Sequence, residues 1–204
     1  MDFKKYIFLG LLLLLTLTII ICCVSNRASK KVFVDFAEIS ESIENGDGDV
    51  NLTIYYMGSH ITTRIPLSVD NLIYGITSIN DKKKRDETNG FFEYKVVVNS
   101  DKLEEHINLL NQICNAVLIP VEHKTVISAR IYFVFESKTS GKIFEVAMWG
   151  AQLDDESNYI EPCIIVNGIA INVNEIFYDV IIPFLPEDAV KELEIYIGRR
   201  TWDE

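Results

Sequence analysis

Catalytic motifs are missing from this sequence of 204 residues. It contains no Gly-x-Ser-x-Gly, no Cys-x-x-Cys and no His-Glu-x-x-His, and Gly141-Lys142 lacks the other residues of a phosphate-binding loop. The three histidines, His60, His106 and His123, have no partner at the spacing of a metal site or a catalytic pair. We therefore predict no catalytic, cofactor-binding or metal-ligating residue.

Cysteine, proline and glycine are also scarce, with four, five and ten residues. An apolar fraction of 49% with 24% charged residues argues against a disordered chain. Beyond the N-terminal segment only Cys114 and Cys163 remain. An oxidising environment would allow them to pair, but two separately buried thiols explain them equally well. Asn51-Leu52-Thr53 is a glycosylation sequon, which matters only in a eukaryotic secretory pathway.

Positive charge is in deficit. The formal net charge is −11, and residues 28–204 carry 16 Lys and Arg against 29 Asp and Glu, a net charge of −13. A domain this acidic repels phosphate backbones and anionic headgroups, so nucleic-acid binding and peripheral membrane binding are both disfavoured. Cationic partners remain possible.

One long apolar run is present, from Tyr6 to Val24, directly after Lys4 and Lys5. At 1.5 Å per residue its 19 positions extend about 28 Å, close to the roughly 30 Å hydrocarbon core of a bilayer. We predict an uncleaved signal-anchor that spans the membrane over residues 6–24.

Two other interpretations of this segment remain, namely cleavage as a signal peptide and lipidation. Cleavage after Ser25 would place Cys23 at the −3 position, but the run is longer than the apolar region of a usual signal peptide. Lipidation at Cys22 would follow Ile19-Ile20-Ile21, although lipoprotein signals have a small residue before the cysteine. The charge-then-apolar order favours an internal N terminus, with the domain outside the cytoplasm.

The chain therefore divides into four parts. We expect a cytoplasmic stub at 1–5, the anchor at 6–24, a linker at 25–31 and a single extracytoplasmic domain at 32–204. Runs of alternating residues followed by helical patterns predict an α+β fold with a mostly antiparallel sheet of hairpins.

The strand predictions follow the alternation of apolar and polar residues. We expect a first strand or extended piece at 32–39, and the runs at 50–57 and 61–67 predict a hairpin across Gly58-Ser59. A further strand is predicted over 91–98. The runs at 127–135 and 142–149 predict a second hairpin, whose segment Ile131–Phe135 is apolar on both faces and should be central.

A third hairpin joins Cys163–Val166 to Ile169–Ile171 through Asn167-Gly168, a pair suited to a type I′ turn. Gly168 should therefore tolerate replacement less well than Gly141, which lies in a longer loop.

Helical periodicity is clearest from about 101 to 116, where one apolar stripe runs along an amphipathic helix. Asp101 and Glu104 have capping-box spacing at its start. Two short C-terminal helices are expected, one capped by Asn174 and ended by Pro183, and the next begun at Pro186.

Several segments carry weak functional signals. The loop 45–51 spaces oxygen side chains as calcium loops do, but an EF-hand begun at Asn45 would meet Val50 where it needs glycine and Tyr56 where it needs glutamate. Solvated loops are the simpler interpretation of this segment, of the acidic cluster 154–156 and of the basic cluster 82–85. Aromatic residues of the central hairpin are expected in the core: Tyr132, Phe133, Phe135, Phe144 and Trp149.

The Lys4-Lys5 start before the apolar run, and the Val166-Asn167-Gly168 hairpin before two helices, resemble small membrane-anchored, uncharacterised envelope proteins of Gram-positive bacteria. This resemblance covers the layout of the chain and implies no functional residue. The leading hypothesis is a non-enzymatic, extracytoplasmic binding or protein-interaction module with a protein partner and no cofactor. The alternatives are a structural or assembly subunit of a membrane complex and an envelope enzyme using carboxylates such as Glu136, Glu145 or Asp154.

Overall fold

The computed structural model describes residues 50–63, 66–76, 86–114, 116, 118–121, 128–148, 152–153, 159–160 and 163–199. The predicted anchor and the predicted strand at 32–39 lie outside these residues. Within the described part of the chain, no helix combines the length and apolar character needed to cross a bilayer.

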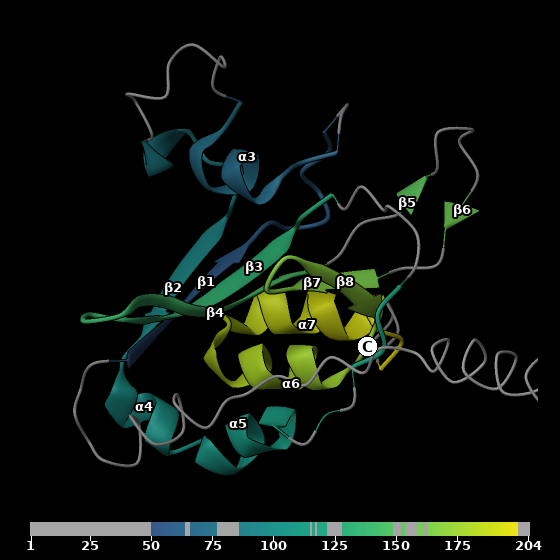
Figure 1. The fold of residues 1–204 in the computed structure, drawn as a ribbon. Helices are drawn as coiled ribbons and strands as arrows, with labels where there is room; N and C mark the ends of the chain where they lie inside the picture. Colours follow the sequence, from purple (N-terminus) through teal and green to yellow (C-terminus); the bar gives the residue numbers. More distant parts are fainter. Residues whose placement is uncertain are drawn as a thin grey trace, which may run out of the picture.

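A six-stranded antiparallel sheet forms the centre of the fold, with strand order β2-β1-β3-β4-β7-β8 (Figure 1). Its strands are β1 (Val50–Tyr56), β2 (Tyr94–Val98), β3 (Ile131–Ser137), β4 (Gly141–Met148), β7 (Cys163–Val166) and β8 (Ile169–Asn172). A separate two-stranded pair consists of β5 (Gln152–Leu153) and β6 (Tyr159–Ile160). The predicted α+β class with a mostly antiparallel sheet is confirmed.

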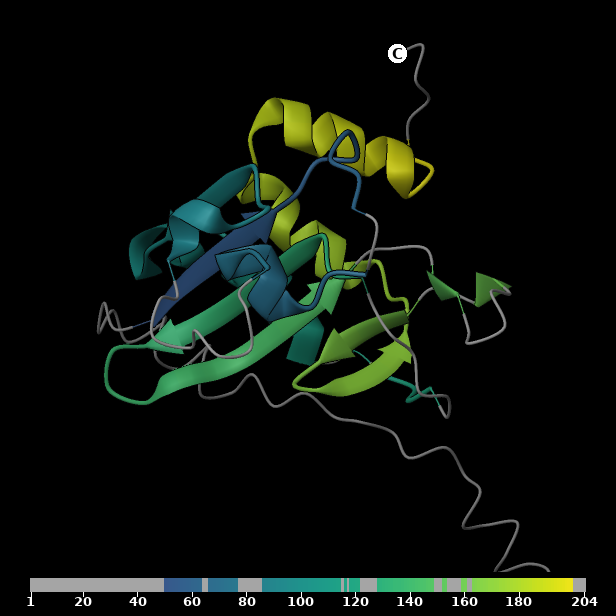
Figure 2. The same cartoon turned by 90° about the horizontal axis from the view of Figure 1, so that it is seen from above.

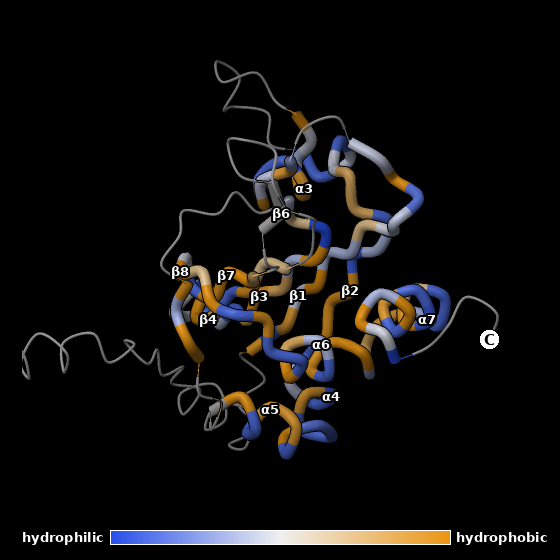
Figure 3. The backbone as a smooth tube through the Cα atoms, turned by 90° about the vertical axis from the view of Figure 1, so that its right-hand side faces the viewer, coloured by the Kyte–Doolittle hydropathy of each residue, from blue (hydrophilic) through white to orange (hydrophobic). Residues whose placement is uncertain are grey.

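Helices lie on both sides of the sheet, but unequally (Figures 1 and 3). One side carries α4 (Ser100–Glu104), α5 (Ile107–Cys114), α6 (Ile176–Ile181), the 3₁₀ helix η2 (Ile182–Phe184) and α7 (Glu187–Tyr196). The other side carries α3 (Val69–Tyr74) and the 3₁₀ helix η1 (Glu87–Asn89). We call these sides the helix-covered face and the open face.

The main core lies between the sheet and the helix-covered face. Alternate strand residues such as Ile54, Phe133 and Phe135 are fully buried there against Phe177 and Leu193 of the helices. Because successive side chains of a strand point to opposite faces, the intervening residues form a second, smaller cluster under α3. The central position predicted for β3 is confirmed, since it pairs with β1 on one edge and β4 on the other.

The predicted hairpin of 50–57 with 61–67 is wrong in its second strand. Residues 61–63 and 66–67 are not in a strand, because both edges of β1 are taken by β2 and β3. Pro66 has no N–H to give to a sheet, and Ser68 caps α3 by accepting a hydrogen bond from the Asn71 N–H at 3.1 Å. Gly75, at φ 74°, ends this unpredicted helix.

The helical segment predicted at 101–116 is present as two helices, α4 and α5. Its N-cap is Asn99 rather than a capping box at Asp101, and the Asn99 side chain accepts from the Lys102 N–H. The His106 N–H bonds to the Leu103 carbonyl at 3.0 Å, a three-residue step that interrupts the helix. The His106 ring packs edge-on against Phe184, 5.0 Å between centroids. The interruption therefore coincides with a tertiary contact to η2.

The hairpin β7–β8 turns at Asn167 and Gly168, whose φ angles of 48° and 78° are both positive, as predicted for a type I′ turn. The Asn167 side-chain oxygen accepts from the Glu145 N–H at 2.9 Å, and the Asn167 N–H bonds to the Glu145 carbonyl at 3.0 Å. The turn is therefore fastened to β4.

The C-terminal helices also follow the sequence pattern. Asn174 accepts from the Ile176 N–H at 3.1 Å and so caps α6, and Pro183 lies in η2 beyond its end. Pro186 directly precedes α7. Both predicted helices are confirmed.

Candidate functional site

The open face is built from the strand residues that point away from the main core. One row crosses the sheet through register partners: Lys95 of β2, Tyr55 of β1, Tyr132 of β3, Ala147 of β4 and Ile165 of β7. Helix α3 lies over only part of this face (Figure 2). The face is hollowed where α3 meets β1, β3, β4 and β7.

A pocket of about 440 Å³ occupies this hollow. Its volume lies within the roughly 300–1,000 Å³ typical of small-molecule sites. It is lined by α3, by β1, β3, β4 and β7, and by the β7–β8 turn. The lining residues are Tyr55, Val69, Asp70, Ile73, Tyr74, Tyr132, Val134, Glu136, Lys142, Glu145, Ala147, Ile165 and Gly168. We call it the open-face pocket.

Three side chains on β3 and β4 form a linked group in its wall. The Tyr132 hydroxyl donates to Glu145 Oε2 at 2.7 Å, and Lys142 Nζ donates to the same oxygen at 2.9 Å. We call Tyr132, Glu145 and Lys142 the Tyr132 triad. Because Asn167 holds the backbone of Glu145 from the neighbouring turn, the carboxylate is fixed from two sides.

A second group of the same composition lies beside it. The Tyr55 hydroxyl donates to Glu87 Oε1 at 2.9 Å, and Lys95 Nζ contacts Glu87 Oε2 at 2.5 Å. The Lys95 ammonium also lies 5.4 Å from the centre of the Tyr55 ring. We call Tyr55, Glu87 and Lys95 the Tyr55 triad, and its tyrosine ring is 6.1 Å from that of Tyr132.

The triads fix the protonation states of their members. Burial and then the hydrogen bonds to Glu87 and Glu145 raise the pKa values of Tyr55 and Tyr132 above the ordinary tyrosine value. The Lys95 hydrogen bond lowers the pKa of Glu87. Burial opposes ionisation of Glu145, but the bonds from Lys142 and Tyr132 outweigh it and lower that pKa. At neutral pH both tyrosines donate and both glutamates are ionised.

Carboxylates outnumber ammonium groups among the described residues that line the pocket. Asp70, Glu136 and Glu145 line it together with Lys142, and Asp70 already has a partner. Among the described residues, none forms a hydrogen bond or ion pair with the exposed Glu136 side chain. The pocket therefore offers ionised carboxylates beside tyrosine rings.

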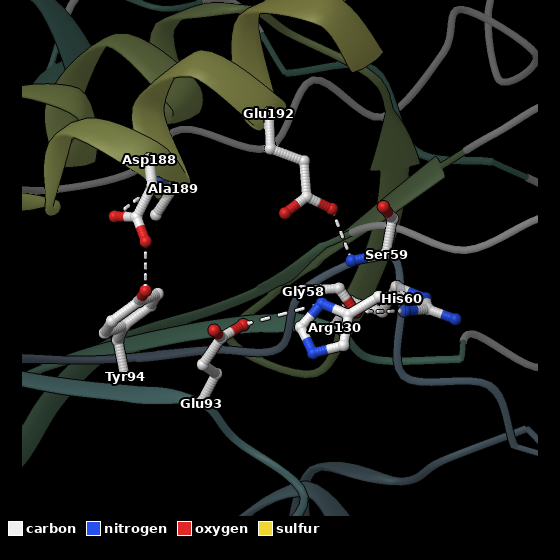
Figure 4. Close-up of polar contacts among 9 residues, drawn as sticks. All are labelled: Gly58, Ser59, His60, Glu93, Tyr94, Arg130, Asp188, Ala189 and Glu192. Carbon is white, nitrogen blue, oxygen red and sulfur yellow. Dashed lines mark hydrogen bonds and ion pairs between the residues drawn. The ribbon is translucent and has the colours of Figure 1, made fainter.

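A separate polar cluster joins α7 to the end of the sheet (Figure 4). The Tyr94 hydroxyl donates to the Asp188 carboxylate, and the Ser59 N–H donates to the Glu192 carboxylate. Two successive turns of α7 are thereby attached to the segments that end β1 and begin β2.

The same cluster contains Arg130 and His60. Arg130 Nη1 donates to the Gly58 carbonyl at 2.9 Å, and His60 Nδ1 lies 3.9 Å from Glu93 Oε2 (Figure 4). None of the residues of this cluster lines the open-face pocket. Its role is to attach α7, so the open-face pocket is the better candidate site.

The structure brings together two of the three carboxylates named from the sequence. Glu136 and Glu145 line one pocket, although they lie on different strands. The third, Asp154, lies outside the described residues, as do His123, Trp149 and the loops 45–49, 82–85 and 154–156.

The remaining candidates fall elsewhere. His106 packs on Phe184 in the helix-covered half. Cys163 is a buried thiol of β7, and the side chain of Cys114 is outside the description, so a pairing of the two stays untested. Phe133, Phe135 and Phe144 are in the main core and Tyr132 is buried in the second cluster, as predicted, and Tyr132 also lines the open-face pocket.

No family model, curated protein or solved structure matches this chain. Within the described residues, no three His, Cys, Asp or Glu side chains gather in a way that would hold a metal ion. The geometry of the pocket is thus the basis for a functional assignment.

Tyr55, Glu87 and α3 are the parts of the candidate site that sequence reasoning missed. The Tyr55 side chain points to the opposite face of the sheet from the main-core residues that alternate with it in β1. Tyr132 does the same in β3. A tyrosine opposite the main-core side of two paired strands is the signal that would have indicated this candidate face.

Proposed function

We propose that this chain is a membrane-anchored, extracytoplasmic binding module that holds a small polar group of its ligand in the open-face pocket. The observation that carries the proposal is the pocket itself, with tyrosine and glutamate side chains held in place by two triads. Such preorganisation lowers the ordering cost of binding, because the site does not have to arrange its polar groups around the ligand.

The proposed placement rests on the sequence. Residues 6–24 have the length and composition of a membrane span, and Lys4 and Lys5 precede them. Placement is tested by introducing Ser140→Cys, an exposed position in the β3–β4 loop, and treating intact cells with a membrane-impermeant thiol reagent. Labelling of intact cells is expected. Labelling that appears only after lysis contradicts the proposed topology.

An enzyme using paired carboxylates is the second candidate, because Glu136 and Glu145 share the pocket. A general acid needs a carboxyl group whose pKa is raised toward neutrality. The pKa of Glu145 is instead lowered, and Tyr132 and Lys142 both occupy one of its oxygens. This arrangement favours recognition over proton transfer.

The binding function is tested with a pair of matched substitutions. Ile165→Trp adds bulk to the pocket wall, whereas Ile169→Trp adds the same bulk to an exposed position across the β7–β8 turn, outside the lining. Full-length protein in nanodiscs would be screened against small polar compounds by thermal shift, and hits measured by calorimetry.

A compound that binds the pocket should bind Ile169→Trp like the wild type and Ile165→Trp at least about tenfold more weakly, a loss of about 1.4 kcal/mol. Equal binding to both variants would place the ligand elsewhere. Chemical turnover of the bound compound would favour the enzyme over the binding module.

A further inference from the structure

We infer that the open-face pocket selects a cation, namely the ammonium or guanidinium group of an amine-bearing ligand, held by Glu136 and Glu145 against the Tyr132 ring. This inference rests on the proposed binding function and specifies the chemical class of the ligand.

The carboxylates of the pocket are the first observation. Among the described lining residues Asp70 already has a partner, and the Lys142 ammonium is bonded to Glu145 Oε2. The Tyr132 hydroxyl contacts that same oxygen, so no described residue bonds to Glu145 Oε1. Together with Glu136, this oxygen leaves carboxylate acceptors for an incoming donor, and charge-assisted hydrogen bonds of this kind are the stronger ones.

The Tyr55 triad shows how such a cation is held. There the chain's own ammonium, on Lys95, contacts a carboxylate and lies over a tyrosine ring. A tyrosine face attracts a cation through the ring quadrupole by about 0.5–2 kcal/mol. The neighbouring Tyr132 and the carboxylates beside it offer the same combination to a ligand.

Electrostatics in the pocket agree with this geometry. After burial and the hydrogen bond to Glu145, the negative charge of Glu136 further raises the pKa of the Tyr132 hydroxyl. Glu136 acts in the same direction on the pKa of Tyr55. The negative electrostatic potential of these carboxylates disfavours a phenolate anion and favours an ammonium group at the same place. The net charge of −13 on residues 28–204 would also steer cations toward the domain.

Three probes of equal carbon number separate charge from shape: 1,4-diaminobutane, the neutral 1,4-butanediol and the anionic succinate. Each would be titrated by calorimetry into full-length protein in nanodiscs at low ionic strength. We expect 1,4-diaminobutane to bind at least about tenfold more tightly than the other two. The expected preference should weaken with added salt, because salt screens partly exposed charges.

Two variants separate binding in the pocket from attraction by the net negative charge of the chain. Glu136→Gln and Glu104→Gln remove the same charge, but Glu104 is an exposed residue of α4 on the helix-covered face. Glu136→Gln should weaken diamine binding at least about fivefold, or roughly 1 kcal/mol, and Glu104→Gln less than about twofold. Equal losses in both variants would overturn the inference, because they would show attraction by net charge alone.

The inference and the proposed function fail in different ways. Binding of 1,4-butanediol or succinate as tight as that of the diamine, and sensitive to Ile165→Trp, overturns the cation inference but supports a binding pocket. The same conclusion follows if a compound from the screen binds and is weakened by Ile165→Trp, but none of the three probes binds. Diamine binding that Ile165→Trp does not change contradicts both.

Discussion

The two faces of the sheet are made from alternate residues of the same strands, yet they differ in chemistry. In β3, Phe133 and Phe135 are buried under helices, while Tyr132, Val134 and Glu136 line the open-face pocket. The helix-covered face has the closed apolar packing of a core. The open face has tyrosines, paired charges and a hollow. The comparison teaches that most of the apolar packing is on one face, and we propose that the other face, with its smaller cluster, also binds a ligand.

The largest difference between the faces should appear when a side chain is truncated in each. Phe133→Ala should lower the free energy of unfolding by about 3–5 kcal/mol, because it leaves a cavity in the main core. Val134→Ala, next to it on the open face, should cost about 1–2 kcal/mol. Chemical denaturation of both variants measures the difference. Equal losses would contradict the greater contribution to stability that we expect from the main core.

The turns of the two hairpins provide the next test, because they fix the register of the strands and so decide which side chains point to each face. A slip of one residue in a hairpin would exchange its faces. Gly168 and Gly141 have φ angles of 78° and 75°, and a Cβ at either position would have no heavy atom within 4 Å. The sequence predicted a smaller cost at Gly141, but the structure places both residues in the left-handed region.

We therefore expect Gly168→Val and Gly141→Val to destabilise by similar amounts, about 1–2 kcal/mol each, because the backbone cost is the same. Urea denaturation of the two purified variants in parallel measures both values. A neutral Gly168→Val would contradict the turn that the structure shows.

Acid should weaken the open face through Glu145. Its lowered pKa means that ionised Glu145 stabilises the folded chain above the unfolded glutamate pKa of about 4.3, and that this stability is lost as pH falls through the folded value. Glu145→Gln should cost about 0.3–1 kcal/mol at pH 7. The deficit should shrink as the pH falls below that unfolded value.

Unfolding curves of the wild type and Glu145→Gln from pH 7 to pH 3 measure this effect. The same change at exposed Glu104 serves as the control, since no described side chain contacts its carboxylate. A deficit of Glu145→Gln that persists at pH 3 would mean that its cause is packing rather than charge.

The smallest effect is expected at the exposed edge of the open face. Val97 of β2 is 60% exposed and Val98 beside it is 2% exposed on the opposite face. Val97→Thr should change the stability by less than about 0.5 kcal/mol, whereas Val98→Thr should cost about 1–3 kcal/mol, because it buries a hydroxyl. Thermal melts of the two variants compare adjacent residues directly.

Much of the sheet could be predicted from the sequence because its strands alternate with period two. The helix interruption at His106 could not, because the apolar stripe continues through it and the contact of His106 with Phe184 comes from a distant segment. Helix α3 was missed because it has only six residues, too few for an apolar stripe, and an alternating run precedes it. Pro66 and Ser68 were the local signals against a strand.

The candidate site was predictable only in part. Glu136 and Glu145 could be named as carboxylates of interest, but their meeting depends on the pairing of β3 with β4, where the register shifts between Phe135 and Glu136. Glu87 reaches Tyr55 from a 3₁₀ helix 32 residues away. Sequence periodicity contains no information on such a pairing.

Isoleucine methyl NMR on the full-length protein in nanodiscs tests the central claim most directly, because neighbouring isoleucines report on the two faces. Ile73 and Ile165 line the open-face pocket, whereas Ile131 and Ile164 are fully buried on the helix-covered face. On titration with 1,4-diaminobutane, the methyl signals of Ile73 and Ile165 should shift in a saturable way while those of Ile131 and Ile164 remain in place. Shifts confined to Ile131 and Ile164, or no saturable shift at Ile73 and Ile165, would contradict a ligand site on the open face.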